Sequence, residues 1–135
     1  MMATEDITVA AAVIRNQEGK ILLARRPDHK HMGGLWEFPG GKVRTGEDPR
    51  SALVRELHEE LGVEASVDSP LSFAIHDEPG LRILLLFFAA RLTAGRPVGN
   101  EGQEVQWVQP SELPNYPTPP ADAALVAELA NRFSP

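Results

Sequence analysis

The chain has 135 residues, is 42% hydrophobic and carries a formal net charge of −6 at pH 7. This length is typical of one domain with a hydrophobic core of its own, so we expect residues 1–135 to form a single domain. The lack of cysteine excludes disulfides, thiolate zinc sites and cysteine nucleophiles. The negative charge argues against a general nucleic-acid-binding surface, which would be basic.

The sequence shows no targeting or membrane signal. Residues Met1–Asp6 lack the basic segment and following apolar run of a signal peptide. The longest apolar run, Ile83–Ala90, is much shorter than the roughly 20 residues that a spanning helix needs. We therefore expect a cytoplasmic protein with no membrane partner.

The first third of the chain predicts three short strands. Ile7–Arg15 and Lys20–Ala24 are apolar, and the turn at Asn16–Gly19 between them predicts a hairpin. A polar loop follows, in which Arg26 and His31 are suited either to contact phosphate groups or simply to keep the loop soluble.

Leu35–Phe38 predicts the third strand, and it leads into Pro39–Lys42. Gly40 and Gly41 allow the backbone to approach a ligand or metal closely. The spacing of a nucleotide-binding P-loop is absent here. None of the histidines shows the His-x-x-x-His spacing of a metal site, so we expect none to be a metal ligand.

The next segment has the start and stop signals of a helix. Asp48 is a good N-cap before Pro49, and Gly62 is suited to end the helix. Glu56, Glu59 and Glu60 stand at i, i+3 and i+4, which places them on one helical face. Like charges this close repel, and a hard divalent cation such as Mg²⁺ or Mn²⁺ would offset that cost. A solvated acidic face is the alternative interpretation.

The second half of the chain predicts three strands and a final helix. Ala65–Ile75 is strand material interrupted by Pro70, and a turn at Asp77–Gly80 precedes the most apolar strand, Leu81–Leu92, which we expect to be central and buried on both faces. A glycine-containing loop leads to a short strand at Glu104–Val108. The last helix runs to about residue 132, with an apolar stripe at Leu125, Val126 and Leu129.

The glutamate helix and its approach resemble the signature of the Nudix hydrolases. The pattern is Gly41, five residues, Glu47, seven residues and then Arg55–Val63, with every fixed position present. The segments His31–Met32, Leu35–Lys42 and Asn100–Gln103 resemble the MutT type within this family. The resemblance implies an α+β fold with a mixed β-sheet sandwiched between α-helices. It also implies Mg²⁺-dependent hydrolysis of a phosphoanhydride bond, with Mn²⁺ as a possible substitute.

The resemblance also implies roles for individual residues. The metal would be held by the Gly40 carbonyl and by the acids Glu56, Glu59, Glu60 and Glu101, although Glu101 alone is an ordinary loop acid. The catalytic group would be Glu56, Glu59, Glu47 and Arg55, with Arg55 holding a glutamate in place, and which glutamate is the base stays open. The substrate-binding group would be Arg26, His31, Glu37, Phe38, Lys42, Phe87 and Asp122.

MutT-type proteins cleave 8-oxo-dGTP to the monophosphate and pyrophosphate, which implies a small nucleotide substrate and no nucleic-acid polymer. They carry asparagine where this chain has Asp122. Reading the edge of 8-oxoguanine needs a hydrogen-bond donor and an acceptor together, and an ionised aspartate only accepts. Asp122 would therefore have to be protonated to read that edge, which requires a pKa raised by burial. The segments Tyr116–Pro117 and Pro120–Asp122 also resemble the Nudix branch that prefers cytidine nucleotides, including modified dCTP. An acid at this position can accept a hydrogen bond from the amino group of cytosine.

Two further alternatives for the function stay open. The substrate can be another diphosphate, such as a dinucleotide polyphosphate or a nucleotide sugar. A catalytically dead Nudix binding domain is also possible, but the presence of Arg55 and all three helix glutamates argues against it. The protein is expected to be a monomer or a homodimer.

Overall fold

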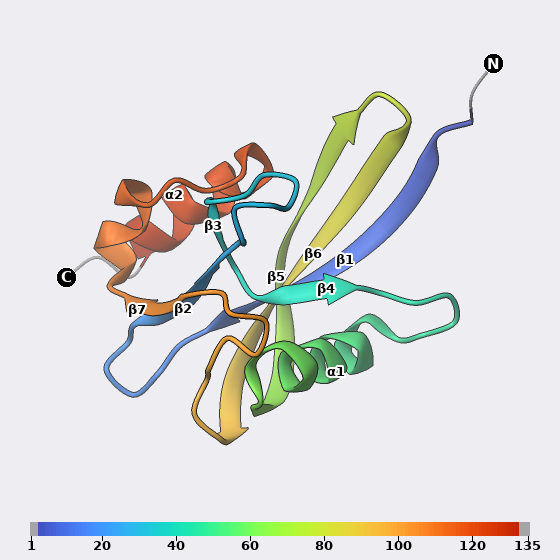
Figure 1. The fold of residues 1–135 in the computed structure, drawn as a ribbon. Coiled ribbons are helices and arrows are strands. Elements are labelled where there is room, and N and C mark those ends of the chain that lie inside the picture. The colour runs from blue at the N-terminus through green and yellow to red at the C-terminus, as the bar shows by residue number, and fades with distance from the viewer. Residues whose placement is uncertain (1–2, 133–135) are drawn as a thin grey trace.

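The computed structural model describes residues 3–132 of the chain (Figure 1). The strands of this part are β1 (Glu5–Ile14), β2 (Ile21–Arg25), β3 (Trp36–Glu37), β4 (Gly40–Lys42), β5 (Glu64–Glu78), β6 (Leu81–Ala94) and β7 (Val105–Val108). The helices are α1 (Pro49–Leu61), α2 (Ala123–Arg132) and two short 3-10 helices, η1 (Pro110–Asn115) and η2 (Pro120–Asp122). Neither α-helix in this range has the length and apolarity needed to cross a bilayer.

The strands form two sheets between α1 and α2, which confirms the mixed α+β architecture (Figure 1). The larger sheet has the strand order β4-β1-β6-β5, and the smaller has the order β3-β2-β7. β1 runs parallel to β6 along its whole length and antiparallel to β4, so both hydrogen-bonding edges of β1 are engaged. β1 therefore lies at the centre of the larger sheet.

The predicted hairpin between the first two strands is wrong. A turn does join them, but a single bridge between Arg15 and Ile21 is the extent of their pairing in the described residues. β2 then pairs with β3 and β7 in the other sheet. The physical reason is that β4 and β6 already occupy the edges of β1. Sequence neighbours pair often, but a free edge is required.

The predicted turn before the most apolar strand is confirmed, since β5 and β6 form a long antiparallel hairpin around it. Pro70 interrupts β5 as predicted, because the register shifts on both sides of it. The expectation that β6 is buried on both faces is only half correct. Phe87 and Phe88 are buried, whereas residues 81–86 are at most half-buried. That half of the hairpin extends past both α-helices (Figure 1).

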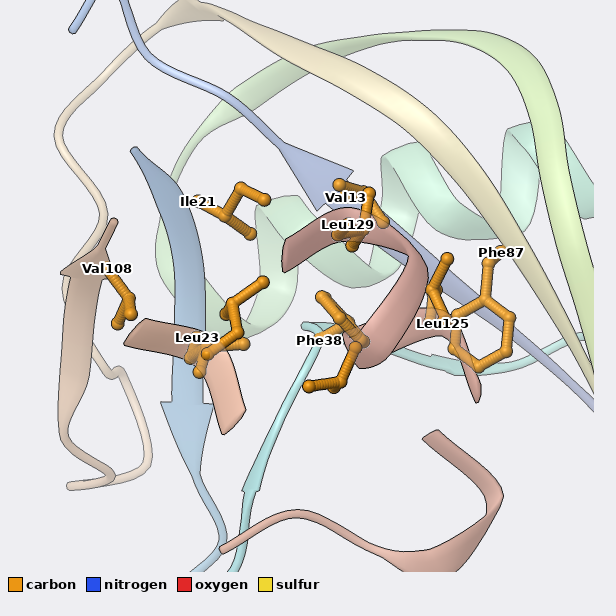
Figure 2. Close-up of a cluster of buried hydrophobic side chains, with 11 residues drawn as sticks. Val13, Ile21, Leu23, Phe38, Phe87, Val108, Leu125 and Leu129 are labelled. Atoms are coloured by element: carbon orange, nitrogen blue, oxygen red, sulfur yellow. The ribbon is translucent and has the colours of Figure 1, made fainter. Parts of the chain in front are cut away.

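The alternation of β1 divides the interior into two cores. Ala11 and Val13 face α2 and pack in a cluster with Phe38, Phe87 and side chains of β2 and α2 (Figure 2). The intervening residues of β1 face α1 and pack against its buried leucines, Leu53, Leu57 and Leu61. A strand whose successive side chains point to opposite faces can serve two cores at once. The larger sheet is thus fixed from both sides.

The helix signals are confirmed in detail. The Asp48 side chain accepts hydrogen bonds from the backbone N–H groups of Arg50 and Ser51 at 3.0 and 3.2 Å, and Gly62 ends the helix in the left-handed region with φ 68°. Glycine adopts this conformation at little steric cost. These caps fix both ends of α1, and with them the direction in which its glutamates point.

We predict that Leu57→Ala lowers the free energy of unfolding by about 2–5 kcal/mol, because Leu57 is fully buried and its removal leaves a cavity between α1 and the sheet. Val54→Ala on the same helix is the matched control. The Val54 side chain is 39% exposed, so a change within about 0.5 kcal/mol is expected. Urea unfolding of wild type, Leu57→Ala and Val54→Ala measures both changes in the free energy of unfolding. Equal losses would mean that α1 does not pack as described.

Candidate active site

One cavity of about 520 Å³ opens between β1, β4, α1, the exposed half of β6 and the loop that follows β2. Ten of the residues predicted for the site line it: Arg26, His31, Glu37, Phe38, Gly40, Lys42, Glu56, Glu60, Phe87 and Asp122. The other four predicted residues are Glu47, Arg55, Glu59 and Glu101, and they lie outside the lining of this cavity. The structure therefore gathers residues from all parts of the chain at one place.

Gly40 and Gly41 lie where β4 approaches its neighbours closely. A Cβ atom at Gly40 would collide with the backbone of Ala10 and Ala11 in β1. A Cβ atom at Gly41 would collide with the carboxylate of Glu56. The sequence predicted a close approach to a ligand or metal. The structure shows that the Gly40 approach is to β1, and that the Gly41 approach brings α1 and its Glu56 carboxylate against β4.

Arg55 connects the helix to the segment before it. Its guanidinium donates two hydrogen bonds of 2.9 Å to the two carboxylate oxygens of Glu47, one of 2.9 Å to Glu56 and one of 3.3 Å to Glu59. It also donates to the Lys42 carbonyl oxygen at 3.1 Å. Such a forked arrangement matches the planar geometry of arginine, which lysine cannot reproduce. Arg55 therefore fixes the positions of three carboxylates.

This network also sets the charges of its members. Hydrogen bonds from the Arg55 side chain and from the Arg44 backbone N–H lower the pKa of Glu47 to about 2. The same pairing, mainly with Glu47, raises the pKa of Arg55 further above its ordinary value. Both groups are therefore ionised at any pH at which the protein would work, and Glu47 serves as a permanent counter-charge to Arg55.

Glu60 faces a different environment on the same helix. Burial raises its pKa to about 8, and repulsion from Glu56, Glu101 and Glu37 contributes in the same direction. A cluster of carboxylates that repel one another is stabilised by a bound cation, and oxygen ligands of this type suit hard divalent ions such as Mg²⁺. The chemistry of these side chains therefore fits a divalent cation.

The loop that carries Glu101 is tied to the end of α1. The Asn100 backbone N–H donates to the Glu60 carbonyl oxygen at 2.9 Å, and the Asn100 side-chain amide donates to the Glu59 carbonyl oxygen at 3.1 Å. Glu101 itself pairs with Lys30, with 3.4 Å between Nζ and Oε2. Glu101 also lines a small hollow together with Glu60 and Glu37. The loop thus brings a fourth acid close to the helix glutamates.

These acids are not arranged as a finished coordination sphere. Within residues 3–132, no three histidine, aspartate or glutamate side chains converge in a way that would hold a metal ion. Glu59 turns to Arg55 and has a half-exposed side chain, and Glu101 turns to Lys30. Glu56 and Glu60 line the cavity. A metal site built from the predicted ligands would therefore need side-chain rotations at Glu59 and Glu101.

The cavity is also lined by Asp122 of η2, together with apolar side chains of β6 and with Phe38. Asp122 is only 3% exposed, and burial together with the nearby charge of Glu37 raises its pKa to about 7. Phe38 and Phe87 pack edge to face with 5.9 Å between ring centroids, and both are almost fully buried. These two rings form a floor that belongs to the core, and their predicted contact with a base stays a prediction.

Sequence reasoning missed several residues around the cavity. Leu81, Ile83 and Leu85 line it, and the period-two alternation of β6 already placed them on the same face as Phe87. His76, Glu78 and Met32 were missed as well. Their proximity to His31 depends on the β5–β6 hairpin meeting the loop after β2, and no local pattern in the sequence predicts that contact.

Comparison with known proteins identifies relatives along most of the chain. Residues 10–128 match the NUDIX domain family. The chain is 43% identical to a CTP pyrophosphohydrolase of Escherichia coli over 89% of this chain and 88% of the relative. It is 40% identical to an 8-oxo-dGTP diphosphatase of Haemophilus influenzae over 93% and 92%.

A solved structure gives the same result. It comes from work on MutT of Aliivibrio salmonicida and Vibrio cholerae, and it superposes with a TM-score of 0.72 at 38% identity, covering 96% of this chain and 100% of that one. The family match, the relatives and the shared fold agree with the glutamate helix and the cavity beside it. This chain therefore belongs to the Nudix family of hydrolases, enzymes that act on phosphoanhydride bonds.

Proposed function

We propose that this enzyme is a Mg²⁺-dependent nucleoside triphosphate diphosphatase that converts 8-oxo-dGTP or a related modified dNTP to the monophosphate and pyrophosphate. The observation that carries the proposal is the cavity itself, because one cavity is lined both by Glu56 and Glu60 and by Asp122. A triphosphate would lie beside the two glutamates with its metal, and the base would lie beside Asp122. The related 8-oxo-dGTP diphosphatases support this substrate.

The metal would be held by Glu56, Glu59 and Glu60 with the Gly40 carbonyl and Glu101. Mg²⁺ is the ion we propose, with Mn²⁺ able to replace it. When bound, such an ion neutralises charge on phosphate oxygens and lowers the pKa of bound water. The raised pKa of Glu60 and the surrounding carboxylates support a cation at this position.

The protein groups would act as follows. Arg55 holds Glu56 beside the cavity and Glu47 completes that ion pair, so both position the reacting groups. Glu56, or Glu59 beside it, takes a proton from the attacking water. The water oxygen forms a bond to the α- or the β-phosphorus while the phosphoanhydride bond between these two phosphorus atoms breaks, which gives the monophosphate and pyrophosphate. Lys42, Arg26 and His31 at the cavity contact the phosphates.

A CTP or modified dCTP diphosphatase is the second candidate, and Asp122 favours it. An ionised carboxylate can accept from the exocyclic amino group of cytosine, whereas the guanine edge needs a donor as well. The related CTP pyrophosphohydrolase supports this alternative. With a pKa of about 7, Asp122 is divided between its neutral and ionised forms near neutral pH. Each form suits one of the two bases.

The remaining features of the proposal follow from a free nucleotide substrate. We infer that residues 1–135 act as one Nudix unit in the cytoplasm, as a monomer or a homodimer, without a nucleic-acid polymer as partner. The cavity of about 520 Å³, with Phe38 and Phe87 in its lining, suits a single nucleotide better than a polymer.

We predict that Glu60→Gln lowers kcat for pyrophosphate release from 8-oxo-dGTP by about 100-fold or more, because an amide contributes no charge to a cation site. Glu112→Gln, an exposed acid on η1, is the matched control and should leave kcat unchanged. Wild-type activity should disappear with EDTA and return with Mg²⁺. Full activity of Glu60→Gln would contradict the assignment of Glu60 to the metal.

We predict that Arg55→Lys lowers kcat by at least roughly tenfold with little change in KM, because lysine keeps the charge but loses the fork that holds Glu47 and Glu56. Arg50→Lys on the same helix is the control, since Arg50 donates to the Asp68 carbonyl oxygen away from the cavity. Steady-state kinetics of both variants measure the difference. A similar loss in the two variants would show that the effect is on the helix and not on the site.

We predict that the ratio of kcat/KM for 8-oxo-dGTP to kcat/KM for CTP falls as pH rises through about 7, where Asp122 loses its proton. The neutral acid present below that pH can donate to guanine, and the carboxylate present above it can only accept. Between pH 6 and pH 8 the ratio should change by roughly 100-fold if each substrate needs one form. Metal and triphosphate titrations affect both substrates and cancel in the ratio. In Asp122→Asn the ratio should not change with pH. If the ratio in that variant changes as steeply as in wild type, Asp122 is not the titrating group.

A further inference from the structure

We propose that Glu78 is a positioning residue for nucleotide binding, which holds the His31 imidazole at the cavity by a polar contact between the β5–β6 hairpin and the loop after β2. This inference rests on the proposed function, because it takes the cavity to be the nucleotide site. Glu78 is the last residue of β5, and His31 lies in the loop between β2 and β3. The contact therefore joins two parts of the chain that are far apart in sequence.

One carboxylate oxygen of Glu78 meets two imidazoles. Its Oε2 atom lies 3.3 Å from Nε2 of His31 and 3.1 Å from Nε2 of His76. His76 is two residues before Glu78 on the same strand, so both side chains leave the same face of β5. The Glu78 side chain is 31% exposed and that of His76 is 20% exposed. The His76–Glu78 pair is thus partly buried on β5, and the more exposed His31 side chain contacts it.

The backbone of the same loop is held independently. Arg26 donates from Nε to the His31 carbonyl oxygen at 2.8 Å, while its guanidinium also pairs with Glu37 at 3.2 Å. The next residue, Met32, has φ 58°, a left-handed conformation that is strained for a non-glycine residue. Such a conformation persists where surrounding contacts impose it. Arg26 on the backbone and Glu78 on the side chain are two such contacts, and together they fix His31 in place.

The position of this contact links it to the substrate. His31 and Arg26 line both the main cavity and a smaller adjoining hollow of about 150 Å³, and His76 and Met32 line the smaller one. Its hydrogen bonds with His76 and His31 lower the pKa of Glu78, so this acid stays ionised and its charge faces imidazole N–H groups. With Nε2 of His31 directed to Glu78, Nδ1 is left for the ligand: it accepts from a sugar hydroxyl in the neutral ring and donates to a phosphate oxygen in the imidazolium.

The first experiment compares Glu78→Ala, Glu78→Gln and Asp77→Ala. Asp77 is the matched control, because it is the adjacent acid on the same hairpin but pairs with Arg82 at 2.8 Å on an exposed surface. For 8-oxo-dGTP and for CTP, Glu78→Ala should raise KM by about tenfold and change kcat by less than about twofold. Glu78→Gln should restore KM in large part, since its amide oxygen still accepts from imidazole N–H groups. Asp77→Ala should keep the wild-type KM.

A double variant separates positioning from a general effect on the fold. If Glu78 acts through His31, then adding Glu78→Ala to His31→Ala should raise KM no further. Independent effects that multiply would overturn the proposal. So would a Glu78→Ala variant whose KM matches that of Asp77→Ala.

A measurement without substrate tests the contact itself. Amide hydrogen exchange over residues 28–34 should become faster in Glu78→Ala than in wild type, and it should be unchanged in Asp77→Ala. If wild-type enzyme releases no pyrophosphate from any nucleoside triphosphate, the proposed function fails while exchange still reports whether Glu78 holds the loop. If exchange over this loop is the same in both variants, the positioning role is overturned whatever the substrate.

Discussion

The ion pairs of Arg55 are the constraint on which the rest of this site depends. One guanidinium holds Glu47 from the segment before the helix, Glu56 and Glu59 from α1, and the carbonyl oxygen of Lys42 from β4. Carboxylates packed this closely would otherwise repel. Because arginine keeps its charge at all working pH values, Glu47 and Glu56 are held without a bound ligand, whereas Glu59 must turn away from Arg55 to join a metal site. Glu56 is thereby held against Gly41, at the wall of the cavity.

The position of the cavity follows from how β1 and the β5–β6 hairpin are covered. β1 contributes to both cores, so its central part is enclosed between α1 and α2. The hairpin is longer than either layer of cover, and its exposed half supplies Leu81, Ile83 and Leu85 to the cavity (Figure 1). The part of β6 that the helices do not cover therefore provides an apolar wall for a ligand next to the acidic helix α1.

Local patterns predicted the helix well and the strand pairing poorly. Asp48, Gly62 and the spacing of the glutamates depend on chemistry within a few residues, so the caps of α1 and its acidic face could be found from the sequence. The partition of β1 and β2 into separate sheets depends on which strand edges are occupied, and the burial of β6 depends on how far the helices reach. The link from Glu78 to His31 has the same non-local origin. The predicted roles of Asp122 and Glu101 came from the family resemblance, because local chemistry alone does not distinguish them from ordinary acids.

The two glycines of β4 also limit how this enzyme can diverge over evolutionary time. A side chain at Gly40 would meet the β1 backbone, so a replacement there disturbs strand packing, whereas one at Gly41 would meet the Glu56 carboxylate, so a replacement there displaces that acid. Variation at this wall of the cavity therefore acts on strand packing or on Glu56 before it acts on a ligand. The loop around residues 26–34 and the segment 119–122 also line the cavity or its adjoining hollow, and their side chains can change without moving a strand.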